Sequence, residues 1–278
     1  MNITPVTEIE KKHIAIMDTS SISFMQGLRD KGIDIGPILK DYDLMIIPEW
    51  VMTEVVDSES RSSFVQELID KGYPIKSIAE ERYAEMTGCE EGNLYQIVLA
   101  STYLLARIRS YLRRYVETAD PIDMSAYSEW VKKLYDEWPI SGEMLSSGRV
   151  KKKNAGEVSI TILAEVISWY YPDTEVLTIY SQDGDVYEFQ RNAEKILRDV
   201  FADKAPIPVS YKSNDAIICQ LFRLGVIKAE EVSQYRKDER KITYSKEQSD
   251  HSIVLVKERV DNDSFIKLIS DTTVHIIF

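Results

Sequence analysis

Acidic side chains stand directly after short apolar runs of this chain, at positions far apart in the sequence. Asp18 follows the run 13–17, and Asp183 and Asp185 follow the run 176–180. Parallel strands of an α/β sheet form their ligand crevice at their carboxyl ends, so acids at those ends meet at one edge. Carboxylates gathered in one place repel one another unless a cation lies among them. The pattern therefore predicts a divalent-metal site.

Two further acids fit the same pattern. Glu54 lies on the helix that follows the apolar run 44–48, and Glu157 follows Gly156 at the start of an apolar helix. Mg²⁺ and Mn²⁺ prefer oxygen ligands, so four or five carboxylates are enough for one or two such ions. Two ions about 4 Å apart can hold a phosphodiester, one activating a water and the other stabilising the leaving oxygen.

Each acid also has an ordinary structural explanation when it is taken alone. Asp18 can cap a helix, and Glu54 can be a solvated helix glutamate. Glu157 can interact favourably with a helix N-terminus. The segment 183–185 can be a tight Asp-Gly turn. The combination of these positions, and no single residue, predicts the metal site.

The elements that must position these acids alternate between strand and helix. Short β-branched runs without a helical stripe predict buried strands, and 3–4 spacing of apolar residues predicts helices. Strand, helix, strand and helix in order favour a parallel sheet covered by helices. The predicted fold is a three-layer, Rossmann-like α/β domain with a central parallel sheet. Its strands are expected at 13–18, 43–47, 74–78, 175–180 and 207–211, and its later helices at 156–170, 185–202 and 214–224.

Two segments depart from this alternation. Residues from about 80 to 150 predict a helical insertion inside a domain that spans 1–225. Residues 226–278 predict a mixed α/β extension packed on the same domain. Its expected strands at 252–256 and 273–278, with a helix at 262–270 between them, either extend the sheet or form a small appendage. Residues 236–251 are the most loop-like part of the chain.

Composition narrows the class of protein. The 278 residues are 44% hydrophobic, which is typical of a folded protein, and the net charge is −12. An acidic chain is not expected to coat duplex DNA, although a local basic patch can still contact nucleic acid. Cys89 and Cys219 lie outside any metal-ligand spacing and suit a reducing compartment. No signal sequence or membrane-spanning run is expected, so the chain is predicted to be cytoplasmic.

The acidic residues, in their order along the chain, resemble the PIN domain. The resemblance rests on Asp18-Thr19-Ser20, on Glu54 after Ile47-Pro48, on Gly156-Glu157, and on Ser181-Gln182-Asp183-Gly184-Asp185. It spans roughly residues 12–202, interrupted by the helical stretch. It implies a metal-dependent nuclease in which Mg²⁺ or Mn²⁺ is held by Asp18, Glu54, Glu157, Asp183 and Asp185. Ser20 matches the small polar residue that supports the first acid.

The resemblance also implies partners. PIN domains include toxin ribonucleases of toxin–antitoxin pairs and enzymes of RNA processing, so an RNA substrate is expected. An antitoxin or other protein partner and a homo-oligomer are both compatible with it. The basic segment Arg149, Lys151, Lys152 and Lys153 directly precedes Gly156-Glu157. It is either a loop that grips phosphates or an ordinary solvated loop.

Several alternatives remain at this stage. Asp215, which also opens a helix, competes with Glu157 as the third acid. A catalytically inactive PIN-like protein that binds RNA or protein is the main rival function. A haloacid-dehalogenase-type phosphatase would need an Asp where Ser20 stands, and a Toprim-type enzyme would need a Glu where Asp18 stands. A metal-dependent glycosyltransferase is supported only by Asp183-Gly184-Asp185.

Overall fold

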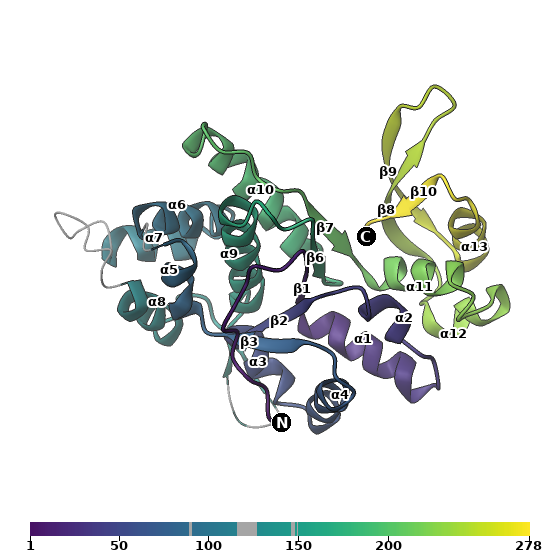
Figure 1. The fold of residues 1–278 in the computed structure, drawn as a ribbon, viewed down its shortest axis with the longest axis horizontal. Coiled ribbons are helices and arrows are strands. Elements are labelled where there is room, and N and C mark those ends of the chain that lie inside the picture. The colour runs from purple at the N-terminus through teal and green to yellow at the C-terminus, as the bar shows by residue number, and fades with distance from the viewer. Residues whose placement is uncertain (89–90, 116–126, 146–147, 149) are drawn as a thin grey trace.

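Five parallel strands form the centre of the molecule (Figure 1). The computed structural model describes residues 1–88, 91–115, 127–145, 148 and 150–278. The sheet has the order β3-β2-β1-β6-β7, so the two strands that are expected to end in acids, β1 and β6, are neighbours. This confirms the predicted α/β fold with a central parallel sheet. The strands are β1 (His13–Met17), β2 (Leu44–Pro48), β3 (Ile75–Ile78), β6 (Val176–Tyr180) and β7 (Val209–Lys212).

The inner strands β1, β2 and β6 are largely apolar because helices cover both faces of the sheet, whereas the edge strands β3 and β7 carry polar residues. In β1, Ile14, Ala15, Ile16 and Met17 are at most 1% exposed. Every central strand begins and ends within two residues of its predicted position, since a continuous apolar run with no helical stripe marks a strand that is buried on both sides.

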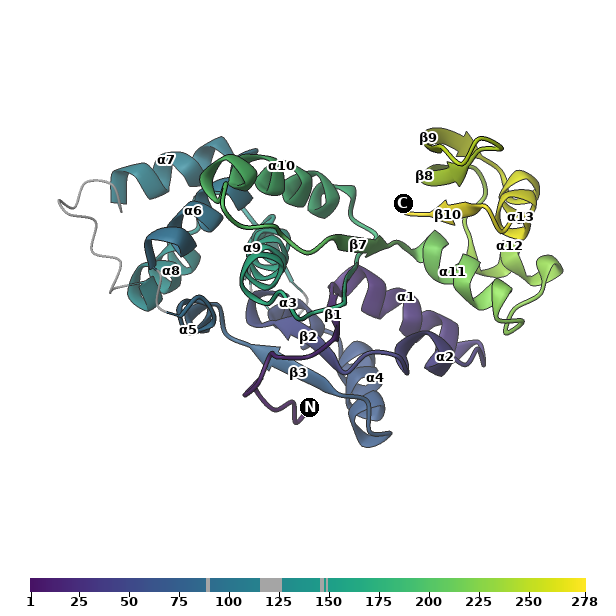
Figure 2. The same cartoon turned by 45° about the horizontal axis from the view of Figure 1, so that its top comes forward.

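Helices form the outer layers. α9 and α10 lie on one face of the sheet, and α1 and α4 lie on the other (Figure 2). α9 is buried around nearly its whole circumference, from Ala155 to Trp169, because it packs on the sheet, on α10 and on the insertion. The helices of this part are α1 (Thr19–Asp30), α2 (Gly36–Leu39), α3 (Glu49–Val55), α4 (Glu59–Asp70), α9 (Ala155–Tyr170), α10 (Gly184–Val200) and α11 (Asn214–Arg223).

The helical insertion lies beside α9 and α10, at the left of Figure 1. α6 contacts both of these helices, and α8 contacts the 3₁₀ helix at the end of β3. A two-stranded hairpin then leads into α9. The elements are the 3₁₀ helix Glu80–Arg82, α5 (Tyr83–Met86), α6 (Glu91–Ser101), α7 (Ala106–Tyr115), α8 (Tyr127–Asp136), β4 (Glu143–Met144) and β5 (Val150–Lys151).

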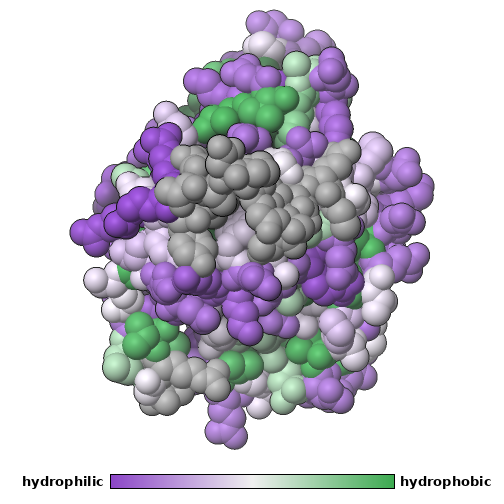
Figure 3. All heavy atoms as spheres, turned by 90° about the vertical axis from the view of Figure 1, so that its left-hand side faces the viewer, coloured by the Kyte–Doolittle hydropathy of each residue, from purple (hydrophilic) through white to green (hydrophobic). Residues whose placement is uncertain are grey.

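The surface on the insertion side is largely hydrophilic, with apolar residues in separate patches (Figure 3). Within the residues that the structure describes, no helix has both the length and the apolar character that a membrane span requires.

The C-terminal residues build a second, antiparallel sheet with the order β10-β8-β9. The prediction that residues 236–251 form a loop is wrong, because β8 occupies residues 240–247, half of that segment. Its many charges hid an alternating pattern in which Ile242 and Tyr244 are buried on one face. The elements are a 3₁₀ helix Ala229–Glu231, α12 (Val232–Tyr235), β8 (Arg240–Glu247), β9 (Ile253–Val260), α13 (Asn262–Ser270) and β10 (Val274–Ile276).

A buried ion pair connects α11 to the C-terminal elements. Arg236 Nε lies 3.1 Å from Asp215 Oδ2, and both side chains are at most 3% exposed. The same guanidinium donates to the Val260 carbonyl and to Asn262 Oδ1, and it lies over the Phe265 ring. Asp215 therefore serves as a structural counter-charge within this part of the chain.

We expect Asp215→Asn to lower the free energy of unfolding by about 3 kcal/mol, because it leaves Arg236 as a buried cation without a carboxylate. Urea unfolding followed by circular dichroism measures the change. Glu175→Gln is the control, since it breaks an exposed ion pair with Lys12 and should leave the midpoint nearly unchanged. Equal midpoints for the two variants would contradict a structural role of the buried pair.

Candidate functional site at the carboxyl edge of the sheet

Asp18 is held by hydroxyl groups from two neighbouring strand ends. It directly follows β1 and caps α1, and its Oδ1 accepts from the backbone N–H of Thr19 at 2.7 Å. Its Oδ2 accepts from Ser20 Oγ at 2.5 Å and from Ser181 Oγ at 2.9 Å. Because Ser181 follows β6, the carboxylate of Asp18 is oriented from both strands.

The end of β6 is tied to the end of β1 by the same hydroxyls. Ser181 Oγ accepts from the backbone N–H of Asp183, and Ser20 Oγ accepts from that of Gln182, each at 3.0 Å. Asp183 caps α10 and accepts from the N–H of Asp185 at 3.0 Å. The acids on β1 and β6 thus belong to one hydrogen-bonded unit. Sequence analysis assigned no supporting role to Ser181, although it occupies the same position after its strand as Asp18 does after β1.

Glu54 and Glu157 come from α3 and α9, which pack closely against each other. Glu54 Oε1 lies 3.9 Å from the place that a Cβ on Gly156 would take. Glu157 is the next residue, and burial, with Asp18 and Asp183 adding to it, raises its pKa to about 7. Because the charges of Asp18 and Asp183 both raise the pKa of Glu157, its carboxyl group lies near the ends of β1 and β6.

Lys151 reaches into this group of acids from the hairpin. Its Nζ lies 3.0 Å from Glu54 Oε2. Burial lowers the pKa of Lys151, but Glu54, Glu157 and Asp18 outweigh it and the net shift is upward. Burial, the largest cause, and the charge of Asp18 raise the pKa of Glu54 although Lys151 lowers it. The short distance between the two charged groups indicates that the Lys151 ammonium belongs to the acid cluster, by which we mean Asp18, Glu54, Glu157 and Asp183.

The remaining predicted site residues lie around this cluster or apart from it. Asp185 is exposed, and burial of its carboxyl group, followed by the charge of Asp183, raises its pKa. Lys152 lies with its ammonium 4.1 Å from the centre of the Tyr135 ring, and Lys153 is exposed. Arg149 lies outside the described residues. Asp215, the rival third acid, is committed to Arg236.

These observations define what the cluster offers a metal ion. Hard carboxylate oxygens from β1, α3, α9 and α10 face one edge of the sheet, and a lysine ammonium already lies among them. Across the described part of the chain, no three acidic, histidine or cysteine side chains lie close enough together to hold an ion as they stand. Comparison of the chain with protein-family models, with curated proteins and with solved structures gives no match.

Glu80 is an acid at the same edge that sequence analysis missed. It follows β3 by two residues, so the pattern that marked Asp18 would also have marked it. Its Oε1 accepts from the N–H of Trp50 at 3.0 Å and from Ser159 Oγ at 2.5 Å. Burial raises its pKa to about 8, and the two hydrogen bonds only partly oppose the shift. Glu80 is therefore a neutral, structural acid between α3 and α9 at neutral pH.

We expect Glu80→Gln to remove part of the pH dependence of stability. Between the ordinary carboxyl pKa and about 8, the unfolded chain loses the Glu80 proton while the folded chain keeps it, so wild-type stability falls as the pH rises. At pH 8 the variant should exceed the wild type by roughly 1 kcal/mol or more, and the two should converge at pH 4. Urea unfolding at a series of pH values tests this, with exposed Asp199→Asn as the control. A constant difference across that range would show that Glu80 is ionised in the folded state.

Proposed function

We propose that this protein is a PIN-like, Mg²⁺- or Mn²⁺-dependent nuclease, and more specifically an endoribonuclease. The observation that carries the proposal is the meeting of acids from four elements at one edge of the parallel sheet. Asp18 and Asp183 share Ser181, and Glu157 senses both of their charges. Glu54 senses Asp18 and lies beside the start of α9. A hydrolase of phosphodiesters needs such a concentration of hard oxygen ligands.

The donor set suits a hard divalent cation in its chemistry. Asp18, Glu54, Glu157 and Asp183 would hold it, with Asp185 at the exposed rim. The side chains of Glu54, Glu157 and Asp183 would have to rotate toward the Asp18 carboxylate, and Glu54 would have to release Lys151. When bound, the ion would supply an activated water and would neutralise charge on the leaving oxygen.

The residues of the chain itself prepare this chemistry. Ser20 and Ser181 fix the direction of the Asp18 carboxylate, so little ordering remains for the bound state. Glu157 has a pKa near neutrality and would ionise when a positive charge arrives. Lys151, once released from Glu54, would be a cation beside the scissile phosphate. Hydrolysis then breaks one P–O bond, and the water oxygen takes its place on phosphorus.

A second function has an observation in its favour. The Lys151–Glu54 pair balances part of the acid charge without any metal ion. A PIN-like protein that has lost the chemistry and binds RNA or a protein would be served by such a self-neutralised cluster. It predicts no cleavage and no stabilisation by Mn²⁺.

Under the nuclease proposal the substrate is RNA, single-stranded or structured, and the setting is the cytoplasm. The acidic balance of the chain makes broad duplex binding unfavourable, and the buried, free Cys219 suits a reducing compartment. A toxin–antitoxin pair, with an antitoxin as protein partner, and an RNA-processing role are both compatible with this proposal.

We expect Asp18→Asn and Asp183→Asn each to reduce Mn²⁺-supported RNA cleavage by about a hundredfold or more, because each removes a charged oxygen ligand. Both residues cap helices, and asparagine caps a helix as well as aspartate does, so the fold should be retained. Cleavage of a labelled RNA, with and without EDTA, provides the measurement.

Asp199→Asn is the matched control, since Asp199 is an exposed acid in the last turn of α10. It should cleave at the wild-type rate. Undiminished cleavage by both site variants would refute the nuclease proposal, and so would cleavage that EDTA does not affect.

We expect Lys151→Met to bind Mn²⁺ about tenfold more tightly than the wild type, a difference of about 1.4 kcal/mol. The ammonium competes with the ion for Glu54 and repels it, and methionine keeps a similar length without the charge. Calorimetric titration with MnCl₂, and the rise in melting temperature with Mn²⁺, measure the change. Lys228→Met, in an exposed position away from the cluster, should bind as the wild type does. Weaker binding by Lys151→Met would mean that the lysine supports the ion.

A further inference from the structure

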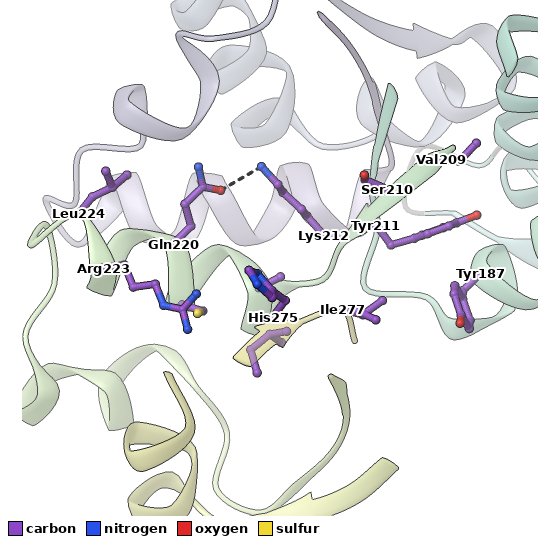
Figure 4. Close-up of a pocket in the computed structure, with 13 residues that line it drawn as sticks. Tyr187, Val209, Ser210, Tyr211, Lys212, Gln220, Arg223, Leu224, His275 and Ile277 are labelled. Atoms are coloured by element: carbon purple, nitrogen blue, oxygen red, sulfur yellow. Dashed lines mark hydrogen bonds between the residues drawn. The ribbon is translucent and has the colours of Figure 1, made fainter. Parts of the chain in front are cut away.

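A groove of about 660 Å³ runs between β7, α11 and β10, on the side of the sheet edge away from β6 (Figure 4). In Figure 4, Gln220 and Arg223 come from α11, His275 from β10, and Lys212 from the end of β7. Apolar side chains, among them Val209, Ile276 and Ile277, also line it. The groove therefore offers both apolar contact and polar groups.

Two strand edges flank the groove. β7 is the last strand of the parallel sheet and pairs with β6, and β10 is the outer strand of the C-terminal sheet and pairs with β8. The chains after these strands meet where the N–H of Ser213 donates to the Ile277 carbonyl at 3.2 Å. Along β7 itself, half of the backbone N–H and C=O groups point away from β6, as they do on any edge strand. Such an edge is a template for one more strand.

The ionisable side chains of the groove include Lys212, Arg223 and His275. Among the described residues that line it there is no aspartate or glutamate, in a chain whose net charge is −12. Lys212 Nζ donates to Gln220 Oε1 at 3.0 Å and lies 3.3 Å from the Tyr42 hydroxyl, which are both neutral groups.

Within the described part of the chain, Arg223 donates to the backbone carbonyls of Ile269, Asp271 and Val274 and to no carboxylate. His275 is exposed beside it. Charged groups with only neutral partners attract an anion, because their own charge is not compensated.

We propose that this groove binds an extended, acidic segment of a partner protein, which adds as a strand to the free edge of β7. Backbone hydrogen bonds to β7 would provide affinity, alternate apolar side chains would enter the groove, and acidic side chains would meet Lys212, Arg223 and His275. This interaction is separate from the acid cluster and does not depend on the nuclease proposal.

A nucleotide fits the same groove less well. Tyr187 and Tyr211 line its aromatic end, and their rings pack against each other and against Phe278 at centroid distances of 5.1–5.6 Å. Their faces are largely taken, so a base would find little surface on which to stack. A second copy of this chain, whose net charge is −12, is the competing acidic occupant and would appear as a dimer.

Fluorescence anisotropy tests the proposal with a labelled, N-acetylated decapeptide in which valine alternates with glutamate. We expect this peptide to bind the full chain in EDTA, and to bind at least about tenfold more tightly than its lysine counterpart or a version N-methylated at alternate residues. Amide hydrogen exchange of residues 209–212 should slow in the complex.

Lys212→Met and His275→Gln should each weaken binding of the glutamate peptide by about threefold or more, since each removes a positive or hydrogen-bonding group from the groove. Lys241→Met, on an exposed position of β8, and Asp18→Asn, in the acid cluster, should bind it as the wild type does. Circular dichroism checks that the variants are folded. The proposal is overturned by absence of binding, by equal binding of the lysine peptide, by wild-type binding of both groove variants, or by a dimer of the chain that occupies the groove instead.

Discussion

Repulsion among half-buried carboxylates is the main physical constraint on this structure. A parallel sheet directs the ends of its strands to one edge, and here that edge receives Asp18, Asp183, Glu157 and Glu54. Water cannot screen them fully, because Glu54 and Glu157 are largely enclosed between α3 and α9. The fold meets this cost in two ways. It supplies hydroxyl donors to Asp18, and it inserts the Lys151 ammonium beside Glu54.

The insertion has a direct part in that balance. Its last element is the short hairpin of β4 and β5, which carries Lys151 and leads within a few residues to the start of α9. The same stretch of chain therefore delivers a cation and an acid to one place. Asn154, with a positive φ of 62°, makes the turn between them. The insertion is thus linked to the chemistry of the edge, in addition to the packing of its α6 on α9 and α10.

Much of the fold could be predicted from the sequence, because its inner strands β1, β2 and β6 are short, largely apolar runs that are buried on both faces. Ile14 to Met17 and Leu177 to Tyr180 leave no other interpretation of comparable strength. β8 could not be found in the same way, since its charged residues outnumber the two that pack inward. Local pattern is informative where burial is complete and weak where a strand is half solvated.

The site shows the same division. The positions of Asp18, Asp183 and Glu157 relative to strands and helices were predictable, because strand ends and helix starts have local signals. The partners of Lys151 and Asp215 were not, since Glu54 and Arg236 come from other elements and only tertiary packing brings them together. Glu80 is a different case, because its position just after a strand was visible in the sequence. Only its burial in the folded chain shows that it is a structural acid.

Gly156 has a consequence for how far apart two acids of the edge can stand. A methyl group at this position would lie 3.3 Å from Val51 Cγ2 and 3.9 Å from Glu54 Oε1. Because Gly156 has no side chain, α3 and α9 can approach each other closely at this position. The distance between the backbones that carry Glu54 and Glu157 therefore depends on this glycine. Any bulkier residue there acts as a wedge, and the acids would separate without either of them being altered.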